Sequence, residues 1–189
     1  MSHATLRADA ARNRELVLDA AGRLFRERGL DVTMHEIADE AGVGVGTVSR
    51  RFHSKDELVA ALVEQRMDRL LDVLRRGVQQ LDDDPWDAFA TAFTDAVELH
   101  VQDRGFIEAL AAQDRCLPPS DAQRAELIGL LDQLVAGASA VGAIRSDLRA
   151  TEIPELACMV SRAGASAAGP GSSDTWRRAC QVVLDGLRA

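Results

Sequence analysis

Small, hydroxyl-bearing and basic side chains gather between Val43 and Lys55, where their types and spacing suit a partner rich in phosphate. Arg and Lys donate charge-assisted hydrogen bonds to phosphate oxygens. Small and short polar side chains on one helix face let a backbone approach base edges in a major groove. The candidate groove-facing residues are Gly44, Val45, Gly46, Thr47 and Ser49, and the candidate phosphate contacts are Arg50, Arg51, His53 and Lys55.

Two short helices are needed to position these residues. Thr33 followed three positions later by Glu36 is a capping box, so we expect a helix that begins at Met34 and ends before Gly42. A second short helix is expected from Gly44 to Phe52, with Val43, Val48 and Phe52 on its packing face. Two short helices joined by a sharp turn are typical of a helix-turn-helix module.

Longer helices are expected on both sides of this pair. A first helix is predicted over residues 9–28, with Gly29 in the left-handed position after it. Ser54 and Glu57 form a second capping box, which opens a long helix. Further along, we expect an N-cap at Asp84 before Pro85, a break or kink at residues 103–105 and a third capping box formed by Ser120 and Gln123. Thr151 is expected to cap a helix that runs to about residue 166, and a flexible loop over 169–173 and a last helix over 174–187 follow it.

The run from Ala20 to Leu58 resembles the DNA-binding domain of the TetR family. The similarity rests on Ala20-Ala21, Leu24-Phe25, Arg28-Gly29, Thr33, Ile37-Ala38, Ala41-Gly42-Val43, Gly46-Thr47-Val48, Arg51-Phe52, Ser54-Lys55 and Leu58. The resemblance implies phosphate contacts at Thr33 and Lys55, and it places His35, Val45, Gly46 and Thr47 nearest the bases. Ser49 stands where the family usually has Tyr, and Gly44 where it usually has a polar residue, so operator affinity is expected to lean on Arg50 and Arg51.

The resemblance also implies a homodimer, a palindromic operator of double-stranded DNA and a small-molecule effector. Residues 85–86, 103–106 and 176–187 are similar to the SbtR-like subgroup. The implied dimer interface is formed by the last two helices, through Ile153, Leu156, Val160, Ala163, Gly164, Trp176, Cys180, Val183 and Leu187.

Aromatic and polar side chains of the C-terminal part suggest where an effector would bind. An apolar pocket with a few convergent polar groups is the usual form of such a site. The candidate ligand-binding residues are Trp86, Phe89, Phe93, His100, Arg104, Phe106, Met159 and Arg162. The alternatives are a core-edge role for His100, a solvated Arg104 and a structural ion pair for Arg162.

Composition and charge limit the other classes of function. Apolar residues make up 47% of the 189 residues, and the charge of −8 is uneven, since residues 1–55 hold nine Lys or Arg against eight Asp or Glu. Three widely spaced cysteines and the lack of a leader or spanning segment predict a reduced, cytoplasmic protein without membrane contact.

The glycine-rich run Gly42–Gly46 does not fit a dinucleotide-binding motif, because Thr47 stands where that motif requires a third Gly. Asp82–Asp84 is best interpreted as a solvated turn.

The sequence therefore predicts an all-α protein with no metal, cofactor or enzymatic activity. An N-terminal three-helix helix-turn-helix domain, residues 1–53, is expected to be joined by a long helix to a ligand-binding and dimerisation domain, residues 54–189. The predicted function is that of a transcriptional repressor released from its operator by an effector. The alternatives are a regulator without ligand control, an activator, a helical protein-binding adaptor, or an enzyme hidden in the C-terminal helices.

Overall fold

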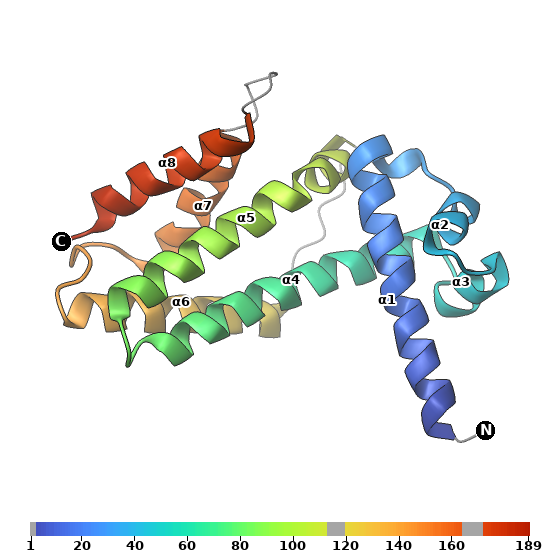
Figure 1. Cartoon of the computed structure of the whole chain (residues 1–189), viewed down its shortest axis with the longest axis horizontal. Helices are drawn as coiled ribbons and strands as arrows, with labels where there is room; N and C mark the ends of the chain where they lie inside the picture. Colours follow the sequence, from blue (N-terminus) through green and yellow to red (C-terminus); the bar gives the residue numbers. More distant parts are fainter. Residues whose placement is uncertain (1–2, 113–119, 164–171) are drawn as a thin grey trace. The chain divides into compact units, whose positions relative to one another are not determined.

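The computed structural model describes residues 3–112, 120–163 and 172–189, and these segments are helical apart from short connections (Figure 1). The α-helices are α1 (His3–Arg28), α2 (Met34–Ala41), α3 (Val45–Arg51), α4 (Lys55–Gln80), α5 (Pro85–Ala112), α6 (Asp121–Ala140), α7 (Ile153–Arg162) and α8 (Ser172–Leu187), with 3-10 turns η1 (Gly29–Asp31) and η2 (Ala150–Glu152). No β-strand is found in these segments, which confirms the all-α expectation.

The chain forms two compact units. The N-terminal unit comprises Met1–Arg66 and Asp103–Pro118, and the C-terminal unit comprises Met67–Gln102 and Pro119–Ala189. The division falls inside α4 and inside α5, so both helices contribute residues to both units. The expected functional boundary between residues 53 and 54 remains a prediction.

Local signals fix the short helices of the N-terminal unit. Both hydrogen bonds of the Thr33–Glu36 capping box are present, which confirms the predicted start of α2. Gly42 ends α2 at φ 66°, and its amide donates to the carbonyls of Ala38 and Asp39. Because a residue with a Cβ is strained in this left-handed conformation, Gly42 is well suited to the turn between α2 and α3.

At the start of α4, one of the two hydrogen bonds of the expected capping box is present and the other has a different partner. The Ser54 hydroxyl accepts a hydrogen bond from the Glu57 amide at 3.1 Å, as predicted. The Glu57 carboxylate, however, accepts from the amide of His53 at 2.8 Å, one residue before the expected partner. This hydrogen bond, together with one from the His53 ring, lowers the pKa of Glu57.

Helix α5 runs without interruption from Pro85 to Ala112, so the predicted break at residues 103–105 is wrong. Asp84 accepts a hydrogen bond from the Asp87 amide at 2.9 Å, which confirms it as the cap of this helix. Gly105 does not interrupt the helix but permits a close contact, because a Cβ at this position would lie 2.8 Å from the carbonyl oxygen of Arg26. The missing side chain therefore lets α5 pack directly on the end of α1.

The end of α5 belongs to the core of the N-terminal unit. Phe106 is 1% exposed and stacks on Phe25 of α1, with 5.8 Å between ring centroids. The Arg66 guanidinium lies 4.1 Å from the Phe106 ring centroid and forms an ion pair with Asp103 at 3.0 Å. Ring stacking, a cation–π contact and an ion pair thus hold the end of α5 against α1 and the start of α4.

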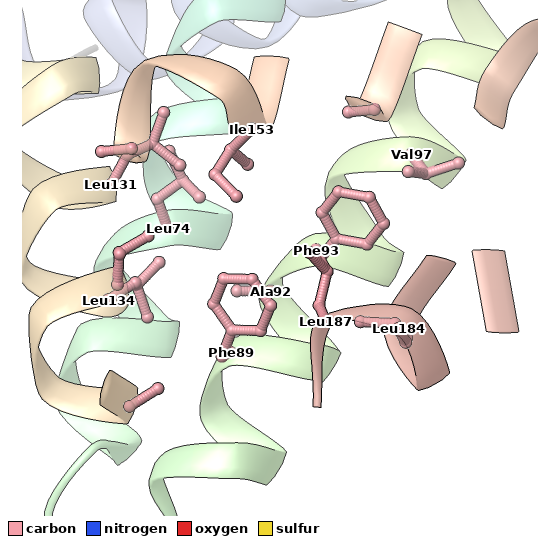
Figure 2. Close-up of a cluster of buried hydrophobic side chains, with 14 of the residues drawn as sticks. Leu74, Phe89, Ala92, Phe93, Val97, Leu131, Leu134, Ile153, Leu184 and Leu187 are labelled. Carbon is pink, nitrogen blue, oxygen red and sulfur yellow. The ribbon is translucent and has the colours of Figure 1, made fainter. Parts of the chain in front are cut away.

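The C-terminal unit is organised around apolar side chains from α4 to α8 (Figure 2). Phe89, Ala92, Phe93 and Val97 come from α5, and they meet leucines of α4, α6 and α8. Gly77 marks a close approach in this core, since a Cβ there would lie 2.7 Å from the Cβ of Ala92. The bundle therefore depends on a residue without a side chain at the α4–α5 contact.

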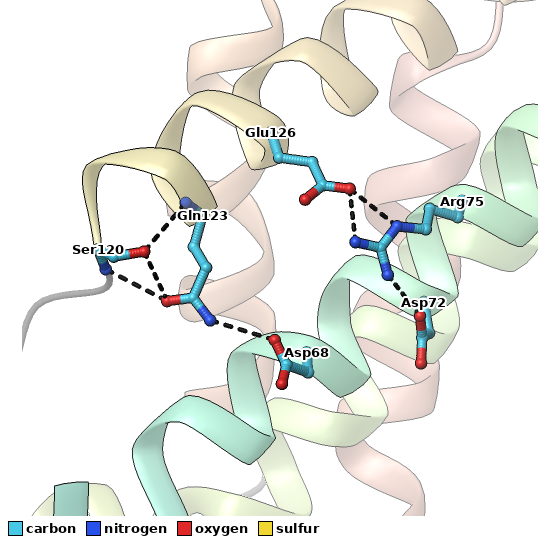
Figure 3. Close-up of polar contacts among 6 residues, drawn as sticks. All are labelled: Asp68, Asp72, Arg75, Ser120, Gln123 and Glu126. Carbon is cyan, nitrogen blue, oxygen red and sulfur yellow. Dashed lines mark hydrogen bonds and ion pairs between the residues drawn. The ribbon is translucent and has the colours of Figure 1, made fainter. Parts of the chain in front are cut away.

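Polar contacts between α4 and α6 line the outside of the same unit (Figure 3). The predicted capping box of Ser120 and Gln123 is confirmed, and the Gln123 amide also donates to Asp68 at 3.1 Å. Arg75 donates two hydrogen bonds to Glu126, at 2.6 and 2.8 Å, and a third to Asp72. These groups are exposed, so each ion pair adds little to the free energy of unfolding.

The last helices differ from prediction at their starts. Thr151 lies within η2 and Glu152 is the N-cap of α7, so the expectation that Thr151 caps this helix is wrong. Helix α8 begins at Ser172, two residues earlier than predicted. Gly164, Cys116 and most of the expected 169–173 loop lie outside the described residues. No helix among the described segments combines the length and the apolar character that crossing a membrane requires.

Candidate nucleic-acid interface and internal cavity

Helix α3 has one buried face and one exposed face. Val48 is fully buried, and Phe52, the residue that ends the helix, is 3% exposed in the same core. Val45, which begins the helix, is 42% exposed, and Gly46, Ser49 and Arg50 are also exposed. The residues predicted to face a groove are therefore at the surface, apart from the half-buried Thr47.

The candidate phosphate contacts lie at the end of α3 and the start of α4. The Arg50 Nε donates to the Gly46 carbonyl at 2.9 Å, which holds that side chain along its own helix. Arg51 and His53 are exposed and Lys55 is half-buried. The His53 Nδ1 lies 3.1 Å from a Glu57 carboxylate oxygen, so a phosphate contact made while this pair persists would use Nε2 of the ring.

Thr33 and His35 lie at the start of α2. His35 is exposed, whereas the Thr33 hydroxyl is already engaged with Glu36. The Thr33 amide, the Thr33 hydroxyl and Arg28 all stabilise the Glu36 carboxylate and lower its pKa to about 2. Thr33 thus has a capping role that is independent of any phosphate contact.

A cavity of about 150 Å³, partly open to solvent, lies within the C-terminal unit. It is lined by side chains of α4, α5, α6 and α7, among them three of the candidate ligand residues, Phe89, Phe93 and His100. The Phe89 and Phe93 rings stack with centroids 6.3 Å apart, and the His100 Nδ1 lies 2.8 Å from the Ala96 carbonyl oxygen. The part of the wall formed by described residues is therefore apolar, with His100 as its one titratable side chain.

The remaining candidate ligand residues do not line this cavity. Trp86 packs between Phe89 and the Arg188 guanidinium. Arg104 pairs with Glu108 on the surface of α5, and Phe106 is buried in the N-terminal unit. Arg162 is exposed.

Met159, the last of these candidates, lies on a different feature. It is 58% exposed and lines an open groove of about 420 Å³ together with Arg145, Glu152, Glu155 and Leu156.

Comparisons with known proteins match both parts of the chain. Residues 17–62 match bacterial regulatory proteins of the tetR family, and residues 84–189 match the C-terminal domain of SbtR-like transcriptional regulators. A TetR transcription regulatory protein from Mycobacterium vanbaalenii is 34% identical, with coverage of 97% of this chain and 99% of that chain and a TM-score of 0.75. The chain belongs to the TetR family.

Two further relatives agree with this membership. A TetR transcriptional regulator from Streptomyces coelicolor is 30% identical over 93% of this chain and 98% of its own, with a TM-score of 0.70. A helix-turn-helix transcriptional regulator from Staphylococcus aureus is 35% identical over 80 residues, which are 42% of this chain and 41% of that protein. The match thus spans about two-fifths of the curated relatives. All are named as transcriptional regulators, in agreement with the prediction of a DNA-binding regulator and not an enzyme.

The residues expected at a dimer interface divide into two groups in this TetR-family chain. Ile153, Val160, Trp176, Cys180 and Leu187 are buried within the single chain, where they already belong to the core of the C-terminal unit. Leu156 and Val183 are half-buried and Ala163 is exposed, while Gly164 lies outside the described residues. The surface that remains for a partner is therefore formed by Leu156, Val183 and Ala163. Met159 and Val182, which are 58% and 55% exposed, add to it.

Two features of the site were missed from sequence. Arg14 of α1 lies beside the end of α3, with its guanidinium 5.9 Å from the Phe52 ring centroid. Its position three residues before the buried Val17 could have placed it on the packed stripe of α1. The second missed feature is that α4, α6 and α7 line the cavity. The sequence does not indicate this, because the leucines of these helices have the spacing of any helical core.

Proposed function

We propose that this TetR-family regulator binds a palindromic operator as a homodimer and is released from it by a small-molecule effector. In this proposal residues 1–53 carry the DNA-contacting groups, and residues 54–189 carry the effector cavity and the dimer face. The protein acts in the cytoplasm, where its DNA lies. The observation that carries the proposal is the two-sided character of α3, whose apolar face is buried while Val45, Gly46, Ser49 and Arg50 remain exposed.

The chemistry of α3 supports insertion into a major groove. Gly46 adds no side chain and Val45 adds a short apolar one, so the backbone can come close to base edges and to thymine methyl groups. Arg50, Arg51 and Lys55 follow at the end of the helix, where they can bind the flanking phosphates. Both kinds of contact are needed, since phosphate contacts fix register and base contacts provide specificity.

The internal cavity supports effector binding. A ligand that binds more tightly to one conformation of the C-terminal unit would shift the protein toward that conformation, and DNA affinity would change with it. Helices α4 and α5 each run through both units, so either helix offers a covalent route for such coupling.

The homodimer part of the proposal uses the surface that the C-terminal unit leaves exposed. Met159 of α7 and Val182 of α8 are large apolar side chains at the surface, on helices that pack on each other. A second copy would remove them from water, which stabilises association. Sedimentation of the purified protein tests this part, and a protein that stays monomeric at micromolar concentration would contradict it.

A gel-shift titration with DNA flanking the protein's own gene tests the operator part. We expect binding that weakens steeply with salt, with a change in slope of about 0.9 for each phosphate contact. Arg51→Ala should flatten the slope by about 1.8 if a dimer uses this residue twice. Arg124→Ala, which removes the same charge from the exposed surface of α6, is the matched control and should leave the slope unchanged.

The outcomes separate the alternatives. An equal slope for Arg51→Ala and the unaltered protein would remove Arg51 from the phosphate contacts. A folded protein that binds none of these DNA fragments at low salt would refute the operator proposal and favour a protein-binding adaptor.

A further inference from the structure

We infer that the cavity in the C-terminal unit takes a small, mostly apolar molecule of about the size of phenol that carries a single hydroxyl donor. The inference rests on the proposed function, because it names the chemical class of the effector. Three features of the cavity carry it: its size, the charge of its wall and the hydrogen bond made by His100.

The size of the cavity limits the ligand to one ring or an equivalent short chain. Its volume is about 150 Å³. An engineered protein cavity of about this volume, lined by Leu, Ile and Phe, binds benzene. A ligand much larger than a substituted benzene would therefore extend out of the cavity or require the surrounding helices to move.

The wall of the cavity is unsuited to a charged ligand. Among the described residues that line it, none is Asp, Glu, Lys or Arg, and apart from His100 they are apolar. A carboxylate or an ammonium group would lose its hydration there without gaining a counter-ion, which is costly in an apolar surrounding. The cavity thus favours an uncharged molecule.

The hydrogen bond of His100 determines which polar group the ligand must bring. The His100 Nδ1 lies 2.8 Å from the Ala96 carbonyl oxygen. A carbonyl oxygen only accepts, so Nδ1 must carry the hydrogen, and Nε2 of the neutral ring is then an acceptor. The group on the ligand that meets Nε2 must therefore donate, as a hydroxyl does.

The aromatic side chains favour a ring in the ligand. Phe89 and Phe93 project from successive turns of α5 and stack with an interplanar angle of 12° (Figure 2). Leu131, Leu134 and Ile153, which also line the cavity, supply the aliphatic part of the wall. A flat apolar ring can pack against both kinds of surface, and a hydroxyl on that ring would be the hydrogen-bond partner for His100.

The test is binding of three ring compounds to the full-length protein without DNA, measured by calorimetry. The probes are p-cresol, toluene, which lacks the hydroxyl, and benzoate, which is charged. A typical net hydrogen bond corresponds to a roughly 2- to 10-fold difference in affinity. We expect p-cresol to bind tighter than toluene by about this factor, and benzoate to bind weakest.

A variant identifies the acceptor. His100→Leu keeps an apolar wall, so toluene should still bind while the preference for p-cresol disappears. Gln133→Leu, which makes a polar-to-leucine change on the exposed surface of α6 away from the cavity, is the matched control and should keep the preference. The comparison of p-cresol with toluene on the unaltered protein needs no variant. The expected preference for p-cresol can therefore be tested even if His100→Leu does not fold.

Three results would overturn the inference: benzoate binding tighter than p-cresol, a p-cresol preference that persists in folded His100→Leu, or no binding of any probe. Because DNA is absent from the assay, these results are independent of the operator. A protein that binds p-cresol with the expected preference but never binds DNA would reject the proposed operator and leave the ligand class standing.

Discussion

Gly77→Ala should destabilise the C-terminal unit through a single misplaced methyl group. The new Cβ would lie 2.7 Å from the Cβ of Ala92 and 3.2 Å from a methyl carbon of Leu134, both closer than ordinary contact. Overpacking of this kind costs about 1–3 kcal/mol. Ala is favoured over Gly in a helix by about 0.8–1.0 kcal/mol, which offsets part of that cost.

Gly129→Ala is the control that isolates the packing effect. Gly129 lies inside α6, and a Cβ there would meet nothing within 4 Å. The helix preference applies equally to both variants, so the difference between them is the cost of overpacking, about 1–3 kcal/mol. For a chain of this length that difference corresponds to about 2–12 °C in Tm.

Thermal unfolding followed by circular dichroism, at matched protein concentration, measures both variants. We expect Gly77→Ala to unfold below Gly129→Ala, and Ala92→Gly added to Gly77→Ala to recover part of the loss, because it removes the opposing methyl group. Equal unfolding temperatures for the two single variants would refute the close α4–α5 contact.

Three further predictions concern the N-terminal unit. Asp103→Ala should lower the free energy of unfolding by about 3 kcal/mol in denaturant titrations, because it leaves a nearly buried guanidinium without its carboxylate, whereas Glu108→Ala, at an exposed pair, should cost under about 1 kcal/mol. The pKa of Glu36 is depressed from 4.5 to about 2, so the stability it gives to α2 is present above pH 4.5 and lost as the pH falls through 2; an NMR titration of its carboxyl carbon with a midpoint near 4.5 would contradict this. Thr47→Val should change which operator sequences are selected from a random pool more than it changes overall affinity, and an equal loss of affinity on all sequences would instead make Thr47 a backbone contact.

The parts of the fold that follow from neighbouring residues could be predicted from sequence. The capping boxes at Thr33 and Ser120 and the turn at Gly42 each depend on groups within four residues, and each is present. The family resemblance was likewise carried by a local run of residues. Such features are set by hydrogen bonds that the chain makes with itself over one turn.

The parts that depend on distant packing could not be predicted. Gly105 suggested a break in α5, but its role is set by the backbone of Arg26, which lies far away in sequence. Phe106 was expected in the ligand site because it is aromatic, yet it packs on Phe25 in the N-terminal unit. For the candidate site, the helix-turn-helix was visible from sequence and the cavity was visible only in part, since its walls come from four helices.

The discontinuous N-terminal unit restricts how this chain can exchange parts with its relatives. A recombination event that replaced only the first 53 residues would leave Phe106 and Leu110 of α5 against a foreign core that had not evolved with them. A working hybrid would have to bring the start of α4 as well and, as a second, separate insert, the matching end of α5. New DNA specificity is therefore acquired more simply by point changes on the exposed face of α3, which contribute little to the core, than by transfer of the whole module.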